Sequence, residues 1–320
     1  MEMAQHVRMF EPRRVLARAL LAGALVSQSV QAQRSGPPRL TSPGTAYTVS
    51  STGASGPLGG GLRSTGATTV QNYIGHVVFA NGRGRMNIVE GGVETLFGKG
   101  DYLLFDSTDV LVVRPRSHEF LTIPRDIASR SMERLGAMGV HIAVADEKVT
   151  LDSLGPGDTI SGIPTRHFRM TVAFNVAMDA GMMQQRLGTE SVTDYWVSSA
   201  PIIPPNPLLR VNGFAVGPMT TGIFRSLSLK VDSAAARMGT MAALKTKSVT
   251  HLITGPGAAI ETQQLYEVSD IARRDVDDDL LILPSGYSGV ALPGDDAPSA
   301  ALDSIAARWR TVPMRRPVSR

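Results

Sequence analysis

The sequence contains no cysteine among its 320 residues. This absence excludes disulfides, thiolate nucleophiles and cysteine-bound metal ions. A lipoprotein anchor also requires a cysteine directly after the cleavage site, so we expect a mature protein without a lipid anchor. An exported chain of this kind has to be stabilised by its packed core alone, and its length is sufficient to form one.

Concentrated charge of one sign is also missing. The formal net charge is +4, and it falls to +2 when residues 1–32 are removed, because that segment holds four arginines and two acids. Binding to nucleic acid requires a concentrated basic face. We therefore expect no nucleic-acid partner.

The N-terminal segment has the organisation of a secretory signal peptide. Arginines within 13–18 precede the apolar run Ala19–Val26, which is far shorter than the ~20 residues of a membrane-spanning helix. Residues 30–32 then place valine and alanine at the −3 and −1 positions of a cleavage site. This order predicts a cleavable signal peptide over 1–32 and a mature protein that is periplasmic or secreted.

Motifs of catalysis and cofactor binding are absent from the sequence. There is no HExxH, no P-loop and no dinucleotide fingerprint, and the residues around Ser288 do not satisfy G-x-S-x-G. The acids Asp275 and Asp277–Asp279 lack the spacing of a calcium loop, which favours a solvated turn. His167 falls on the polar side of a predicted strand. We expect no catalytic residue, no metal and no cofactor, and hence a protein that is not an enzyme.

The composition divides the mature chain into three parts. Residues 33–68 are rich in Gly, Ser, Thr and Pro and have almost no large apolar side chains, which predicts a disordered linker. One domain is predicted over 69–290. A C-terminal tail is predicted over 291–320, with a short amphipathic helix in which Leu302–Trp309 has apolar residues at helical spacing.

Within the predicted domain, short strands alternate with turns, which is typical of an antiparallel sheet or barrel. Asn81-Gly82 is a hairpin signal of type I′. The clearest strand spans Thr165–Val176, because apolar and polar residues alternate there. Its apolar positions are Phe168, Met170, Val172, Phe174 and Val176. A final hairpin within Ala242–Tyr287 closes the sheet and leads into an apolar strand at 280–284.

Helices are predicted at only a few places in the domain. One is expected at Asp126–Met138 and another at 218–238. The candidate packing residues of the second helix are Met219, Ile223, Leu227, Leu229 and Met238. The fold class is therefore mainly β with few helices.

Three blocks of the sequence carry a recognisable pattern. They are LGPGDTISGIPTRHFRMTV (154–172), TDYWV (193–197) and, within 243–287, ALKTKSV, YEVSDI and DVDDDLLILPSGY. These blocks resemble a bacterial exported family of unknown function that is similar to the LolA/LppX-type lipoprotein carriers. The resemblance covers roughly residues 70–290, although Ala243 replaces a proline of the family. It implies a curved antiparallel sheet, an incomplete β-barrel closed by a helix, and no active-site residue.

Our leading hypothesis is an exported, soluble, non-enzymatic protein that binds a lipid, an acyl chain or a lipoprotein inside the curved sheet. The predicted wall of this cavity consists of Phe168, Met170, Val172, Phe174 and Trp196. The alternative is a structural or protein-interaction module of the cell envelope with a filled core, and a hydrolase with unrecognised carboxylates is a third. A void of ~300–1,000 Å³ favours the carrier, whereas a solid core favours the module.

Overall fold

The computed structural model describes residues 40–58, 72–93, 96–123, 141–180, 183–198, 224–239, 242–255, 258–291 and 299–311. All of them belong to one compact unit, Arg39–Arg320. The predicted signal peptide and the predicted helix at Asp126–Met138 lie outside the described residues.

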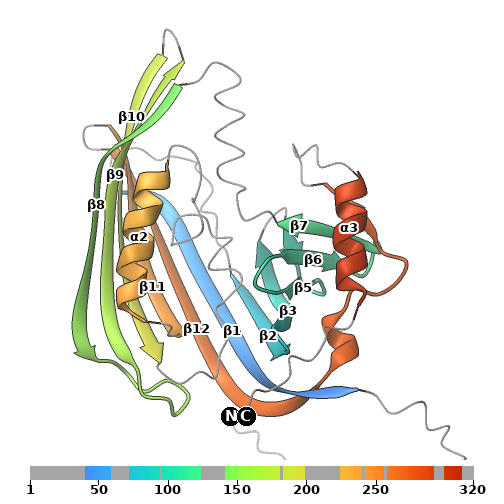
Figure 1. Cartoon of the computed structure of the whole chain (residues 1–320). Coiled ribbons are helices and arrows are strands. Elements are labelled where there is room, and N and C mark those ends of the chain that lie inside the picture. The colour runs from blue at the N-terminus through green and yellow to red at the C-terminus, as the bar shows by residue number, and fades with distance from the viewer. Residues whose placement is uncertain are drawn as a thin grey trace, which may run out of the picture. The chain divides into compact units, whose positions relative to one another are not determined.

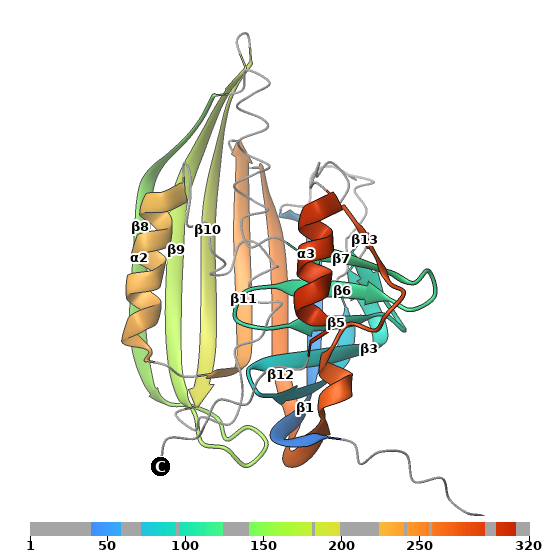
Figure 2. The same cartoon turned by 45° about the vertical axis from the view of Figure 1, so that its right-hand side comes forward.

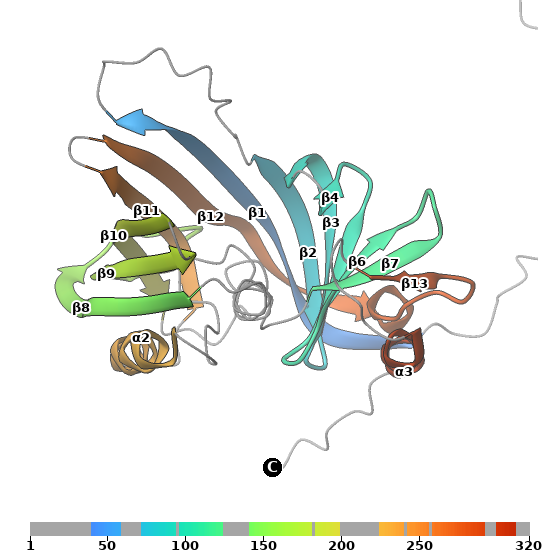
Figure 3. The ribbon, with the colours of Figure 1, turned by 90° about the horizontal axis from the view of Figure 1, so that it is seen from above.

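One large sheet contains the described strands in the order β13-β7-β6-β5-β3-β2-β1-β12-β11-β10-β9-β8, with β4 paired to β3 (Figure 1). The strands are β1 (Thr41–Leu58), β2 (Tyr73–Ala80), β3 (Arg83–Val93), β4 (Phe97–Gly98), β5 (Tyr102–Phe105), β6 (Val110–Arg114), β7 (Glu119–Ile123), β8 (His141–Pro156), β9 (Arg166–Ala180), β10 (Met183–Ser198), β11 (Ala242–Gly255), β12 (Ala258–Asp277) and β13 (Ser288–Val290). Only β13 and β7 pair in parallel among these strands. No pairing joins the end strands β8 and β13 within the described ranges, so the curved sheet is not closed (Figure 3). The mainly β fold class is confirmed.

The sheet consists of two meanders that share one seam. Strands β1 to β7 form the first meander and β8 to β12 the second, and each strand pairs mostly with its neighbours in sequence. The seam is the antiparallel pair β1–β12, which runs from Thr41 opposite Asp277 to Leu58 opposite Ala259. Among the described strands, this pair therefore joins the two meanders into one continuous sheet.

Strand β1 shows that the prediction of a disordered linker over 33–68 is wrong for Thr41–Leu58. This strand pairs with β12 on one edge and β2 on the other, and Tyr47 is buried. Its small residues permit close packing, since a Cβ atom on Gly44 would lie 2.4 Å from the Phe79 carbonyl oxygen. Backbone hydrogen bonds along both edges of β1 therefore offset the conformational entropy that this segment loses when it becomes ordered. The composition alone had predicted that this entropy loss would keep the segment disordered.

The predicted hairpins are present. Asn81 and Gly82 have φ angles of 51° and 78°, and the positive sign at both positions is what a type I′ turn between β2 and β3 requires. The hairpin predicted within Ala242–Tyr287 is β11–β12. It lies in the middle of the strand order and does not close the sheet, contrary to the prediction.

The segment after β12 differs from the predictions made for it. The predicted strand at 280–284 is absent, because the 3-10 helix η3 (Asp278–Leu281) follows β12 directly. Leu281 and Leu283 are buried without strand pairing, and such short apolar runs do not reveal their backbone conformation. Asp278 is buried as well, so this part of the acidic cluster is not a solvated turn.

The inner face of the sheet, defined here as the face that carries Phe168 and Tyr266, has two apolar cores with a polar band between them. The first core occupies the curl from β12 to β7. The second lies on β8 to β11 beneath helix α2 (Arg225–Arg237). The band between them contains paired hydroxyls of β10 and β11, such as Thr193 and Ser248, whose oxygens are 2.8 Å apart. The inner face is therefore not one continuous apolar wall.

Helix α3 (Ser299–Trp309) packs on the opposite face of β5, β6 and β7 (Figure 2). Its buried residues are Leu302, Ala306 and Trp309. The Arg83 guanidinium lies 4.5 Å from the centre of the Trp309 ring and donates hydrogen bonds to the carbonyls of Arg308 and Thr311. The predicted C-terminal helix is thus confirmed, and it belongs to the packed structure instead of a loose tail.

Candidate ligand-binding site beside helix α2

Strand β9 brings most of the predicted cavity wall together. Phe168, Met170 and Phe174 are buried on the inner face, and Val172 is half-buried on the same face. Alternation along the strand places these side chains on one side, as the sequence predicted.

Trp196 does not belong to this wall. It lies opposite His167 in the register of β9 and β10, on the outer face of the sheet. Its ring stacks on the His167 imidazole, with the ring centres 4.5 Å apart and the planes at 10°. The sequence could not reveal this, because the face that Trp196 occupies depends on the register between the two strands.

Helix α2 covers the wall. Its buried apolar side chains, Leu227, Val231 and Ala234, recur at helical spacing. Together with Phe224 before the helix and Met238 after it, they pack against apolar residues of β8, β9 and β10. The rings of Phe174 and Phe224 meet edge to face, 6.1 Å apart. Among the described residues, Phe168, Met170 and Phe174 of the predicted wall therefore pack in an apolar core with α2.

The helix differs from its prediction in detail. The predicted range was 218–238, and the described helix is Arg225–Arg237. Leu229, which was predicted to pack inward, is 61% exposed, because it falls on the side of α2 that faces away from the sheet. Met219 and Ile223 lie outside the described residues.

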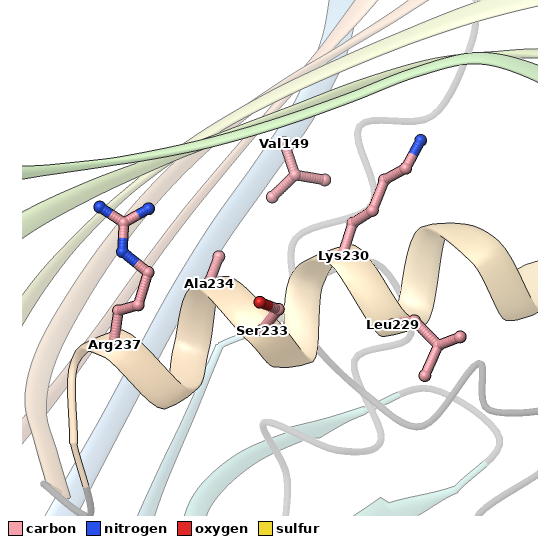
Figure 4. Close-up of a pocket in the computed structure, with 6 residues that line it drawn as sticks. All are labelled: Val149, Leu229, Lys230, Ser233, Ala234 and Arg237. Atoms are coloured by element: carbon pink, nitrogen blue, oxygen red, sulfur yellow. The ribbon is translucent and has the colours of Figure 1, made fainter.

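A groove of about 360 Å³ runs between α2 and strand β8. Its lining residues are Val149, Leu229, Lys230, Ser233, Ala234 and Arg237 (Figure 4). Val149 and Ala234 form an apolar floor, and the long side chains of Lys230 and Arg237 extend on either side of Val149 (Figure 4). The groove therefore combines an apolar base with cationic ends.

The two cations differ in what they contact. Lys230 Nζ lies 2.9 Å from Glu147 Oε2, and Ser226 Oγ donates to the same oxygen at 2.7 Å. Burial alone would raise the pKa of Glu147, but the hydrogen bonds from Ser226 and Lys230 and the lysine charge together lower this pKa. Lys230 is thus neutralised by an ionised partner. Arg237 forms no ion pair with any residue in the described part of the chain.

This arrangement can hold an amphiphile. The apolar floor suits a short stretch of hydrocarbon. The Arg237 guanidinium, which has no ion-pair partner among the described residues, presents a fork of donors to a carboxylate or phosphate. The volume lies within the range of small-molecule sites. Sequence reasoning missed this groove, since it is formed only when α2 docks against β8. The part of the chain that the structure describes contains no group of three or more His, Asp or Glu residues able to hold a metal ion.

Comparisons with known proteins give no family. No protein-family model matches the chain, and no curated protein matches it. An uncharacterized conserved protein from Thermus thermophilus aligns at 8% identity and a TM-score of 0.28, covering 77% of this chain and 90% of that one. The attachment invasion locus protein Ail of Yersinia pestis, solved with the heparin analogue sucrose octasulfate, aligns at 7% identity and a TM-score of 0.11, covering 72% and 99%. Similarities this weak support no argument about this chain.

None of the helices in the described part of the chain is long and apolar enough to cross a membrane.

Proposed function

We propose that this protein is an exported, non-enzymatic binding protein that holds an amphiphilic ligand, an acyl chain with an acidic head, in the groove beside α2. The observation that carries the proposal is the unpaired Arg237 at the end of an apolar-floored groove, a statement that holds for the described residues. An acidic head would pair with Arg237 while the chain lies on Val149 and Ala234.

Two further features support a carrier that resembles the LolA/LppX type. The sheet is curved and unclosed, and α2 lies on its inner face, as in the half-barrel that the sequence pattern implies. The N-terminal basic, apolar and small-residue order supports a periplasmic or secreted location. The hydroxyl band in the centre of the sheet favours the groove over the sheet interior as the apolar site.

A fluorescent fatty acid tests the proposal. Dansyl-labelled undecanoic acid should bind the purified mature protein, and palmitate should displace it. Arg237→Gln should weaken binding of the fatty acid about tenfold or more, because a charge-assisted hydrogen bond is lost. It should leave the binding of a dansyl-labelled fatty alcohol nearly unchanged. Arg225→Gln is the matched control, since Arg225 is an exposed arginine of the same helix outside the groove.

Mass spectrometry of lipid extracted from protein purified from its native host provides a second, independent measurement. The proposal fails if no fatty acid binds and repeated extractions return no lipid. It also fails if Arg225→Gln and Arg237→Gln weaken binding equally.

A second candidate function is favoured by the packing of α2 on the predicted wall. Because Phe168, Met170 and Phe174 lie in a filled core, the same fold could serve as a structural or interaction module of the cell envelope. If this second function is correct, chemical cross-linking in native cells should link this chain to a protein partner. Extraction of the purified chain should then return no lipid.

A further inference from the structure

Strand β3 carries two arginines that differ in what they contact. Arg83 and Arg85 lie on the face where α3 packs, because alternate side chains of a strand point the same way. Both terminal nitrogens of Arg83 donate to backbone carbonyls at the end of α3. Arg85 donates from Nε to Asn87 Oδ1 at 2.8 Å, and it has no ion pair among the residues that the structure describes. Its two terminal nitrogens have no protein acceptor in that part of the chain, and the function proposed above does not use them.

The Arg85 guanidinium lies half-buried against an aromatic ring. Its Cζ atom is 3.7 Å from the centre of the Tyr102 ring, and Tyr102 itself is buried. Burial lowers the pKa of Arg85, although the hydroxyl groups of Tyr102 and Tyr287 counteract this. A cation that has lost part of its hydration is normally balanced by an anion. Within the described ranges no carboxylate pairs with Arg85, so its charge is available to an anionic ligand.

Two further hydrogen-bond donors belong to the same cluster. Asn87 accepts from Arg85 through its carbonyl oxygen, which leaves its NH₂ group as a donor. Burial and a hydrogen bond with Tyr287 raise the pKa of Tyr102 to about 12, although the Arg85 charge lowers it. A hydrogen bond raises the pKa of the hydroxyl group that donates it, so Tyr102 is the donor. The Tyr287 hydroxyl group therefore keeps its own proton for another acceptor.

We propose that Arg85, Asn87 and Tyr287 bind the carboxylate of a small organic acid. The two terminal nitrogens of Arg85, the Asn87 amide nitrogen and the Tyr287 hydroxyl group are four donor groups with one positive charge. An ionised carboxylate has one negative charge and about four lone-pair positions, so it matches the cluster in both respects. A phosphate dianion would carry a second negative charge without a second cation among these three residues.

Val78 provides an apolar surface beside the donors. It lies opposite Arg85 in the register of β2 and β3, which places both side chains on one face, and it is half-buried. The apolar body of the acid can rest on Val78 while its carboxylate pairs with Arg85. Benzoate combines such a body with a carboxylate and is therefore a suitable probe.

Titration of the mature protein with benzoate, followed by NMR of labelled tyrosine, tests this proposal. The Arg237→Gln variant is the starting protein, so that the groove beside α2 does not contribute a second carboxylate site. Benzamide serves as an uncharged probe of nearly the same shape, and inorganic phosphate as an anion of a different class. Benzoate should shift the Tyr287 signal and bind at least about tenfold more tightly than either other probe.

Variants in the same background divide the expected interactions. Arg85→Gln should weaken benzoate about tenfold and leave benzamide unchanged, because it removes the charge and the fork of donors. Tyr287→Phe keeps the ring and its packing but removes one donor, so it should weaken benzoate about threefold or more. Arg186→Gln is the matched control, since Arg186 is an exposed arginine of β10.

Three results would overturn the proposal. The first is that benzoate does not bind, and the second is that benzamide or phosphate binds as tightly as benzoate. The third is that Arg85→Gln and Tyr287→Phe both weaken benzoate no more than Arg186→Gln does. Because Tyr287→Phe preserves the packed ring, it tests the site even if Arg85→Gln disturbs the fold.

Discussion

The contact between Arg83 and helix α3 makes a quantitative prediction about stability. Arg83 is buried in β3, and its guanidinium donates to the carbonyls of Thr311 at 2.7 Å and Arg308 at 3.0 Å. The Arg308 carbonyl lies in the last turn of α3, where the carbonyls of a helix have no partner within it, and Thr311 follows the helix. Arg83→Met keeps the approximate length of the side chain and removes both hydrogen bonds.

The size of the effect follows from opposing contributions. Each hydrogen bond to a charged group contributes about 1.5–3 kcal/mol, and the guanidinium over Trp309 adds about 0.5–2 kcal/mol. The cost of burying the charge opposes them: burial lowers the pKa of Arg83, although the Asp106 carboxylate counteracts this. We therefore expect Arg83→Met to lower the free energy of unfolding by about 2–4 kcal/mol.

Tryptophan fluorescence can measure this effect at α3 itself. The chain has two tryptophans, so in a Trp196→Phe background all tryptophan emission comes from Trp309, which is fully buried. Urea unfolding of this protein with and without Arg83→Met gives the change in free energy. Arg274→Met is the control, because Arg274 is exposed on β12. If the two methionine variants unfold at the same urea concentration, Arg83 does not fasten α3 and the reasoning is wrong.

Two further predictions concern the sheet. Gly84→Ala should lower the free energy of unfolding in urea by about 1–3 kcal/mol, because its Cβ atom would lie 2.1 Å from the Phe105 ring. Gly98→Ala is the control and should cost little, because its Cβ atom would enter open space. Equal costs for the two variants would contradict this reasoning. Burial alone would raise the pKa of Asp194. The hydrogen bonds from Arg169 and His167, together with the charges of these two residues, lower this pKa below its ordinary value of 3.8. The stability that this ionised carboxylate contributes is fully present above pH 3.8 and is lost as the pH falls through the lowered pKa. Asp194→Asn should therefore lower the free energy of unfolding in urea at pH 6. It should also reduce the slope with which that free energy declines at low pH. An unchanged slope would exclude Asp194 as its source.

Local sequence patterns predicted the elements whose formation depends on neighbouring residues. Alternation on β9 identified the buried positions Phe168, Met170 and Phe174, because successive side chains of a strand point to opposite faces. Asn81-Gly82 identified the β2–β3 turn, because both residues tolerate positive φ. These features require no knowledge of distant parts of the chain.

The main errors involve contacts between separate segments. The small residues of β1 looked disordered because a stabilising partner, β12, lies far along the chain. Trp196 was assigned to the wrong face because the register of β9 and β10 is not visible in the composition of either strand. The groove at Arg237 could not be predicted, since it is created by the docking of α2 beside Val149.

The seam between β1 and β12 has a consequence for the order in which the protein folds. Strand β1 (Thr41–Leu58) is made well before its second partner, β12 (Ala258–Asp277). Until that partner is available, one edge of β1 has no strand to pair with, and the closing of such a long loop is slow compared with local pairing. The first meander can therefore assemble early, while the joined sheet cannot exist before β12 is available. For a chain that we propose is exported, the two meanders would therefore be joined only after β12 has crossed the membrane.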